Sequence, residues 1–190
     1  MATFFTKGGF KEEAVLTPTF EFLKFPKVEE KEKLEIPLGG KKGKGLVTII
    51  DKEDYKRLKK ISSGKIFIIN GYAAIKYRNI SYRLHRFIIN TPDNMITDHI
   101  NRNKLDNRKS NLRVCDKYQN QQHKKNKKVR SGYKGVYIRK KGGKIYYLAV
   151  IVAYGKSHYL GSFNTPLKAA KAYNRGAKKY HKEFALLNKI

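Results

Sequence analysis

The chain has 190 residues, of which 43 are Lys or Arg and 15 are Asp or Glu, so its formal net charge at pH 7 is +28. A hydrophobic fraction of 40%, with 13 Tyr and 10 Phe, allows packed cores and excludes a disordered basic tail. The single cysteine excludes a disulfide framework and a cysteine-rich zinc site. No membrane-length apolar run and no secretory leader are present, so we expect a cytoplasmic protein whose partner is a polyanion.

The basic excess is concentrated toward the C-terminus. Residues 1–36 contain six Lys and seven Glu, whereas residues 117–182 contain 18 Lys or Arg and no acid. An ordinary solvated face mixes the two signs, so this stretch predicts a nucleic-acid footprint. A carboxylate in such a field repels phosphate, so each acid between Tyr55 and Lys117 needs a cap, a turn or a metal to explain it. These acids are Asp93, Asp98, Asp106 and Asp116.

The first half of the chain is expected to form an N-terminal arm of unknown role over residues 1–33 and a β-rich unit over residues 34–90. In the β-rich unit, Asp51 is expected to cap a helix over residues 52–61. Runs of β-branched and aromatic residues predict strands at 46–50, 66–69, 72–77 and 82–89. Between these runs, two dipeptides mark hairpin turns, a strong signal followed by a weak one: Asn70-Gly71 and Arg78-Asn79.

The next segment, residues 91–125, is predicted to be a strand hairpin followed by a helix, with residues 82–90 as its leading strand. We expect strands at 95–100 and 111–115, separated by a polar loop. Asp116 and Gln119 have the spacing of a capping box that opens a helix running to about Lys125. A basic linker over residues 126–131 follows, and linkers of this charge often lie on phosphates.

Residues 132–190 are predicted to be a two-layer domain of three antiparallel strands and one helix, so the fold class is α+β. The strands are expected at 133–139, 145–153 and 157–163. Thr165 and Pro166 have the pattern of a helix cap and first helical residue. The inward stripe of that helix is expected to contain Leu167, Ala170, Tyr173, Ala177, Tyr180 and Phe184.

Four polar residues have the composition of a phosphodiester-cleaving site: Asp98 and His99 on the first strand of the hairpin, Asn111 on the second, and Asn120 on the helix. Asp98 and the Asn120 amide oxygen are hard ligands suited to one Mg²⁺ or Mn²⁺ ion. His99, with an ordinary pKa of ~6.5, can accept a proton from the attacking water. Asn111 can hold the imidazole ring in one orientation. The set predicts metal-dependent hydrolysis.

These residues resemble the HNH homing endonucleases of the ββα-metal class. The resemblance is carried by Leu84-His85-Arg86, Asp98-His99-Ile100, Asn107-Arg108, Asn111-Leu112-Arg113 and Gln119-Asn120. It implies that His99 is the general base, Asp98 and Asn120 are metal ligands, and Asn111 orients the histidine. It also implies products with a 5′-phosphate and a 3′-hydroxyl. Many members of the family have a second histidine at the position of Asn120.

The C-terminal segment resembles the AP2/ERF DNA-binding domain. The matching residues are Tyr133, Gly135-Val136, Ala149, Ile151, Gly155-Lys156, Leu160-Gly161, Phe163, Thr165, Ala169-Ala170, Ala172-Tyr173 and Asn188. The upstream Ile36-Pro37-Leu38 and Asp51-x-x-Asp54-Tyr55 are similar to the leader of phage HNH–AP2 proteins. The resemblance implies that the sheet enters the major groove of DNA. This chain departs from the family in having no tryptophan and in the apolar Leu148, Val150 and Val152 on that face.

Several roles remain open at the level of sequence. His85 either packs behind the site or approaches the phosphate, and His123 is either a further ligand or phosphate contact or a solvated helix residue. Cys115 is expected to be a small strand residue. DNA contacts are expected from Lys124, Lys125, Lys127, Lys128, Arg130, Lys134, Tyr137, Arg139, Lys141 and Tyr159.

The sequence as a whole therefore predicts a monomeric, metal-dependent HNH endonuclease of the homing or phage type that binds double-stranded DNA. It would make a nick or, with a second site, a double-strand break. The alternative is a non-catalytic AP2-type DNA-binding regulator with a degenerate nuclease core. An RNA-binding protein is a weaker alternative, because no RNP-like aromatic strand is present.

Overall fold

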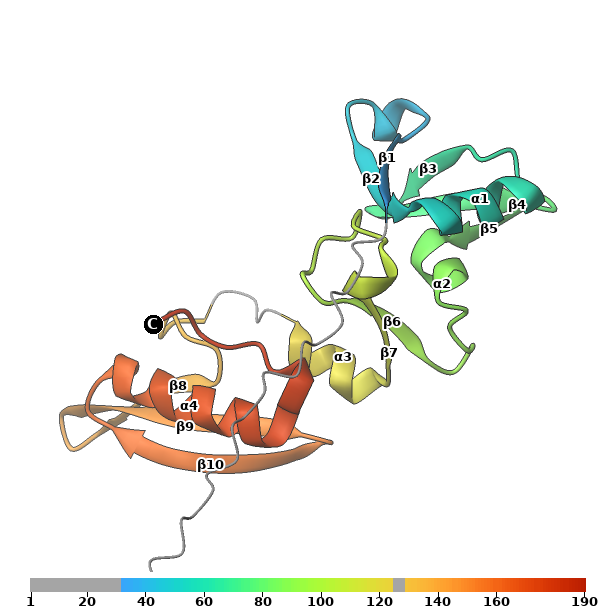
Figure 1. Ribbon diagram of the computed structural model, residues 1–190. Coiled ribbons are helices and arrows are strands. Elements are labelled where there is room, and N and C mark those ends of the chain that lie inside the picture. Colours follow the sequence, from blue (N-terminus) through green and yellow to red (C-terminus); the bar gives the residue numbers. More distant parts are fainter. Residues whose placement is uncertain (1–31, 125–128) are drawn as a thin grey trace, which may run out of the picture. The chain divides into compact units, whose positions relative to one another are not determined.

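The structure is a computed structural model, and it describes residues 32–124 and 129–190 (Figure 1). The predicted arm, apart from its last two residues, and linker residues 126–128 lie outside the described residues. In the described part, the fold is mixed, with four small antiparallel sheets and a few helices. None of the described helices has the length and apolar character needed to span a membrane.

The first two sheets form the β-rich unit. Strand β1 (Lys33–Pro37) pairs with β2 (Val47–Asp51), and a short 3-10 turn, η1 (Lys41–Gly43), lies between them. Helix α1 has the predicted bounds, Lys52–Ile61. A three-stranded meander of β3, β4 and β5 follows: Ile66–Ile69, Tyr72–Tyr77 and Ile80–Arg83. The buried core of this unit contains Leu38, Ile50, Leu58, Ile66, Ala73, Ile75, Leu84 and Ile88, and it extends to Leu112.

Both predicted hairpin turns are present in this meander. Asn70 and Gly71 have φ of 51° and 79°, and Arg78 and Asn79 have φ of 45° and 64°. Positive φ at both central residues is the mark of the turn whose twist matches the flanking strands. The weak signal at Arg78-Asn79 therefore reports the same turn geometry as the strong one.

The predicted strand over residues 82–89 is wrong, and with it the leading strand assigned to residues 82–90. Strand β5 ends at Arg83, and the chain continues as helix α2 (Leu84–Ile88). Leu84 and Ile88 are four residues apart and both are buried in the core, as one face of a helix requires. Burial of this face outweighs the strand propensity of the Phe87–Ile89 run.

The central hairpin is formed by β6 (Ile96–His99) and β7 (Leu112–Cys115), with Asp98 opposite Arg113. Asn111 is the last residue of the 3-10 turn η2 (Lys109–Asn111) and so precedes the strand on which it was expected. Helix α3 (Lys117–His123) begins with the predicted capping box, in which Asp116 and Gln119 bond reciprocally. The helix ends at His123, short of the predicted end.

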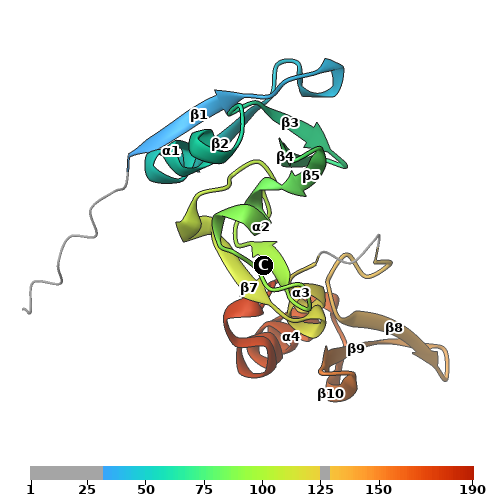
Figure 2. The ribbon, with the colours of Figure 1, turned by 90° about the vertical axis from the view of Figure 1, so that its right-hand side faces the viewer.

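The C-terminal part contains a sheet of order β10-β9-β8 with helix α4 on one face (Figures 1 and 2). The elements are β8 (Val136–Lys141), β9 (Lys144–Ala153), β10 (Lys156–Phe163), α4 (Pro166–His181) and the 3-10 turn η3 (Lys182–Phe184). Ala149 and Ile151 of β9 are buried together with residues of α4.

The cap predicted for α4 is present, but one residue predicted for its inward face is exposed. Thr165 accepts a hydrogen bond from Lys168 N, which confirms the predicted cap. Leu167 is 42% exposed, so its place in the inward stripe is wrong, and Ala169 is buried instead. Gly135 lies so close to Tyr173 that a Cβ there would be 2.1 Å from the ring, and its φ of 71° is left-handed. Only glycine fits this approach without displacement.

Candidate nuclease site

A pocket of about 880 Å³ brings most of the predicted site residues together. Asp98 and His99 reach it from β6, and Asn120 and His123 reach it from α3. His85 lines it from α2. Three elements that are separate in the sequence therefore converge on one cavity, whereas Asn111 does not line it.

His99 is buried, and its environment assigns the position of its ring proton. Asn107 is 0% exposed, and its Nδ2 donates to Thr48 Oγ1 at 2.8 Å, while the Thr48 hydroxyl donates to Leu105 O at 2.8 Å. The Asn107 oxygen, Oδ1, then faces His99 Nε2 at 3.3 Å and accepts its hydrogen. This chain of hydrogen bonds leaves the lone pair of the imidazole on Nδ1.

The charge of His99 is set by the same surroundings. Burial lowers the pKa of His99 below its ordinary value, and this outweighs the hydrogen bond to Asn107 and the nearby Asp98 charge, which raise it. The ring is therefore neutral near pH 7, which is the form that accepts a proton.

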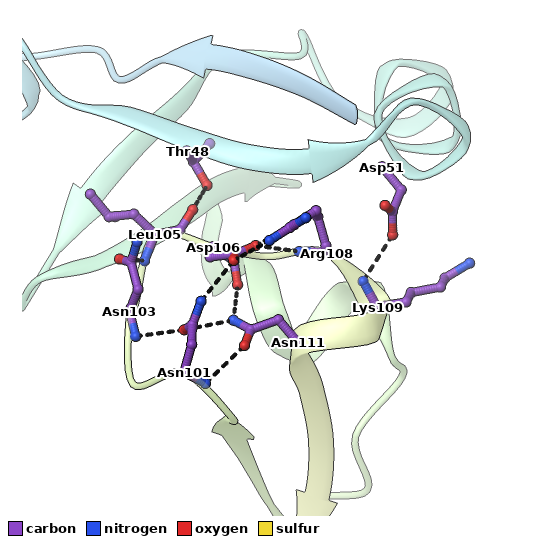
Figure 3. Close-up of polar contacts among 9 residues, drawn as sticks. All are labelled: Thr48, Asp51, Asn101, Asn103, Leu105, Asp106, Arg108, Lys109 and Asn111. Atoms are coloured by element: carbon purple, nitrogen blue, oxygen red, sulfur yellow. Dashed lines mark hydrogen bonds and ion pairs between the residues drawn. The ribbon is translucent and has the colours of Figure 1, made fainter. Parts of the chain in front are cut away.

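The prediction that Asn111 orients His99 is corrected by the structure, which gives this contact to Asn107. The Asn111 side chain closes the loop that precedes it: Nδ2 donates to Asp106 O at 2.8 Å and to Asn101 Oδ1 at 3.0 Å. Its Oδ1 accepts from Asn101 N at 2.9 Å (Figure 3). Asn111 does not contact His99 because it lies immediately before β7, where its side chain is directed into the loop. The loop residue Asn107 makes the contact instead.

Asp106 is more than the turn residue that the sequence suggested. It is buried, and its carboxylate accepts hydrogen bonds from the Arg108 guanidinium at 2.7 and 2.8 Å and from Asn101 Nδ2 at 2.8 Å (Figure 3). The Arg108 guanidinium lowers the pKa of Asp106, so the carboxylate stays ionised. The ion pair between Asp106 and Arg108 thus stabilises the loop between β6 and β7.

The β-rich unit pins this loop from the other side. Ile49 N donates to Leu105 O at 2.8 Å, and Asn107 N donates to Ile49 O at 2.7 Å. Asp51 Oδ2 accepts from Lys109 N at 2.8 Å (Figure 3). Asp51 precedes α1 as predicted, but its side chain makes no capping hydrogen bond and instead accepts the hydrogen bond from Lys109 N.

Asp98 is buried and is contacted by the side chains of Arg113 and His123. Arg113 donates to Asp98 Oδ2 from Nε at 2.9 Å and from Nη2 at 2.7 Å. His123 Nδ1 lies 3.1 Å from Oδ1 and 3.0 Å from Oδ2. His123 is therefore buried against the carboxylate, and its interpretation as a solvated helix residue is wrong.

Arg113 is a site residue that sequence reasoning missed. It lies directly opposite Asp98 in the β6–β7 register, where opposite charges attract. Its guanidinium also lies 3.9 Å from the centroid of the Phe184 ring, and Nη1 donates to Glu183 O at 2.7 Å. The pairing of Arg113 with Asp98 follows from the β6–β7 register, which the sequence alone did not define.

The donor chemistry of the pocket fits a hard divalent cation. Asp98 supplies carboxylate oxygens and Asn120 supplies an amide oxygen, both at the same cavity. Mg²⁺ is usually held by one or two carboxylates together with phosphate oxygens and water, so two protein oxygen donors are sufficient. In the described chain, no cluster of three or more His, Cys, Asp or Glu side chains could hold a metal.

The predicted DNA contacts of the C-terminal sheet are partly placed by the structure. Tyr137 and Tyr159 are 55% and 63% exposed, and Arg139 and Lys141 are exposed as well. Tyr137 is opposite Leu148, and Tyr159 is opposite Val150, so both tyrosines lie on the face that α4 leaves open. Further exposed residues of the predicted set are Lys124 and Arg130, while Lys125, Lys127 and Lys128 lie outside the described residues.

Lys134 is placed differently from the expectation. Its Nζ donates to Lys124 O at 2.8 Å and also to Gln122 O. Burial lowers the pKa of Lys134 to about 8. The ammonium is therefore engaged with the end of α3 rather than presented on the sheet.

The central segment is similar to a known protein family. Residues 90–122, a minor part of the chain, match the model of the HNH endonuclease family. Asp98, His99, Asn111 and Asn120 all lie within the match, whereas His85 precedes it. Because the match ends at residue 122, the resemblance of residues 132–190 to AP2/ERF domains stays a prediction.

The chain is also similar to a viral protein. Over 127 residues the chain is 36% identical to a protein of Acanthamoeba polyphaga mimivirus named as an uncharacterized HNH endonuclease. The alignment covers 64% of this chain and 64% of the relative, so the chain spans less than two thirds of that protein. No solved structure matches the chain.

Proposed function

We propose that the protein is a metal-dependent endonuclease that binds duplex DNA and hydrolyses its phosphodiester bonds, leaving a 5′-phosphate and a 3′-hydroxyl. The observation that carries the proposal is the pocket itself, which combines a neutral imidazole of assigned tautomer with two hard oxygen donors. The HNH match over residues 90–122 supports the same reaction class. We further propose the homing type and action as a monomer.

In this proposal each pocket residue has one task. His99 Nδ1 accepts a proton from the attacking water, and Asn107 keeps that nitrogen unprotonated. Asp98 and Asn120 would hold Mg²⁺ or Mn²⁺, which stabilises charge on the phosphate and on the leaving oxygen. Arg113 and His123 keep the Asp98 carboxylate in place from the side.

Duplex DNA would be bound largely through the basic C-terminal part. The open face of the β8–β10 sheet presents Tyr137, Arg139, Lys141 and Tyr159, and we propose that it enters the major groove. Leu148 and Val150, opposite the two tyrosines, would contact apolar groups such as thymine methyls. The charge of +28 predicts steep loss of binding with salt.

A plasmid assay tests the reaction. We expect supercoiled plasmid to be relaxed with Mg²⁺ or Mn²⁺ and to stay intact with EDTA. His99→Ala should abolish cleavage and retain DNA binding. His158→Ala is the matched control, because His158 stacks on Tyr180 with ring centroids 4.3 Å apart and does not line the pocket. Normal cleavage by His99→Ala would overturn the assignment of the base.

One observation favours the second candidate, a non-catalytic DNA-binding regulator. Arg113 occupies Asp98 Oδ2 with two hydrogen bonds, as a residue that replaces a lost cation would do. This candidate requires sequence-selective DNA binding that is independent of metal, with no strand scission under any divalent cation. Measurement of binding and scission in the same titration of Mg²⁺ and Mn²⁺ distinguishes the two functions.

A further inference from the structure

One wall of the nuclease pocket comes from the β-rich unit, outside the residues that match the HNH family. Tyr72 at the start of β4 and Arg83 at the end of β5 line the pocket together with Lys104 of the β6–β7 loop. The Arg83 guanidinium carbon is 4.9 Å from the centroid of the Tyr72 ring, and Lys104 Nζ is 4.2 Å from it. Two cations from distant parts of the sequence therefore share one aromatic ring.

These two cations have no acidic partner among the residues that the structure describes, because no salt bridge joins Arg83 or Lys104 to a carboxylate there. Arg86, also at the pocket, differs because its guanidinium donates to the Met95, Thr91 and Pro92 carbonyl oxygens. The pocket-lining carboxylate, Asp98, is already paired with Arg113 and His123. Like charges held together without a counter-charge favour an anionic ligand.

The wall continues to the proposed base without adding charge. His85 lies between Tyr72 and His99, with ring centroids 5.1 Å from each. Burial lowers the pKa of His85 to about 3, with smaller contributions from His99, Arg83 and Arg86, so His85 is neutral at pH 7. The Tyr72 and His99 ring centroids are 6.2 Å apart. On a DNA strand whose scissile phosphate lies at His99, a neighbouring backbone phosphate would therefore lie beside Tyr72 and the two cations.

We propose that Arg83 and Lys104, held on the Tyr72 ring, bind the backbone phosphate next to the scissile bond on the cleaved DNA strand. Arg83 donates hydrogen bonds to this phosphate, and Lys104 contributes a point charge. The wall thereby fixes the register of the strand over His99. This subsite rests on the proposed nuclease function and names the part of the substrate that the β-rich unit recognises.

The salt dependence of DNA binding tests the subsite without requiring cleavage. Affinity for a duplex is measured with EDTA at several salt concentrations for the full chain, Arg83→Gln and Lys104→Gln. Each substitution should reduce the slope of log K against log salt by about 0.9, the value for one phosphate contact. The matched controls are Arg78→Gln, which removes a guanidinium from the Tyr77 ring outside the pocket, and Lys60→Gln on α1. We expect their slopes to be unchanged.

The Tyr72 ring is tested by a conservative pair. Tyr72→Phe retains the platform and should bind and cleave like the wild-type protein, whereas Tyr72→Leu should weaken both. In single-turnover and steady-state cleavage, Arg83→Gln should lower kcat/KM about tenfold, as expected for one lost charge-assisted hydrogen bond. Circular dichroism and Tm establish that each variant is folded.

The two proposals fail in different ways. Absence of cleavage by the wild-type protein with Mg²⁺ and Mn²⁺ overturns the nuclease function, and the salt slopes still judge the subsite. If the wild-type protein cleaves but Arg83→Gln and Lys104→Gln match it in slope and rate, the subsite is overturned. Equal slope losses in the subsite variants and in both controls also overturn it, because binding is then diffuse.

Discussion

Asn107→Ala perturbs the proposed base through its hydrogen-bond partner. The substitution removes the bond to Thr48 Oγ1 at 2.8 Å and the bond from His99 Nε2 at 3.3 Å. Each is worth about 1 kcal/mol net, and the buried Nε2–H group left without an acceptor costs about 1 kcal/mol more. We therefore expect a destabilisation of about 3 kcal/mol, or a fall in Tm of roughly 6–12 °C for a chain of this length.

The expected catalytic effect of Asn107→Ala is separate from its effect on stability. Without Asn107 Oδ1, the His99 ring is free to take the other tautomer, in which Nδ1 carries the proton and cannot act as the base. Loss of a group that orients a functional histidine typically costs about 10–100-fold, and we expect this loss in kcat. KM should change little, because Asn107 does not line the pocket.

Asn111→Ala is the comparison that makes the test sharp. Asn111 makes three hydrogen bonds in the same loop and none to His99, so its loss should destabilise the protein to a similar degree with a smaller effect on kcat. Single-turnover nicking at 25 °C, with Tm measured for each variant, separates the two effects. The reasoning is refuted if folded Asn107→Ala cleaves at the wild-type rate, or if Asn111→Ala is the slower variant at equal Tm.

Three further substitutions or reactions test the fold and the site. Arg113→Gln should lower kcat/KM by about tenfold in plasmid nicking, because Asp98 Oδ2 loses the two hydrogen bonds from the guanidinium; an unchanged rate would assign Arg113 to structure alone. Gly135→Ala should lower stability by roughly 3 kcal/mol in urea unfolding, and Gly132→Ala by only about 1 kcal/mol, because a Cβ at 132 meets nothing within 4 Å. Equal losses would contradict the close approach at Gly135. Burial raises the pKa of Cys115 to about 11, so alkylation at pH 8 should be slow in the folded protein and fast in urea. Rapid labelling of the native thiol would contradict its burial.

Local signals in the sequence predicted much of the fold. The turn at Asn70-Gly71, the capping box at Asp116 and the Thr165 cap each depend on residues within a few positions of one another. Such features are decided by short-range sterics and hydrogen bonds, so the sequence contains the whole interaction. The predicted bounds of α1 also agree with the structure, although the Asp51 side chain that was expected to cap the helix makes no capping hydrogen bond.

The incorrect predictions depended on tertiary contacts. The run from Leu84 to Ile89 has strand propensity, and only the burial of Leu84 and Ile88 in one core makes it a helix. Lys134 was expected to contact DNA because it is a basic residue of the C-terminal segment. In the structure its ammonium donates hydrogen bonds to backbone carbonyl oxygens at the end of α3. Neither partner is close in sequence, so no periodicity could have indicated it.

The candidate site shows the same division. Asp98, His99 and Asn120 were predicted correctly as residues of one cavity because their spacing places them on a hairpin and the following helix. The orienting residue was not, because Asn107 reaches His99 only after Thr48 of β2 has fixed its amide. The orientation of the proposed base thus depends in part on Thr48 of the β-rich unit, which lies outside the HNH match.

The acids retained in the positive field explain where the pocket lies. Asp116 caps α3, Asp106 is neutralised by Arg108 at the centre of the β6–β7 loop, and exposed Asp93 lies 3.8 Å from Arg86. Asp116 and Asp106 therefore have structural roles, whereas Asp93 is exposed to solvent beside Arg86. Asp98 differs because it lines the pocket, where it is balanced only by side chains that hold it in place. We propose that a divalent ion joins the Asp98 carboxylate, because a phosphate would approach this negative charge only when a further positive charge is present.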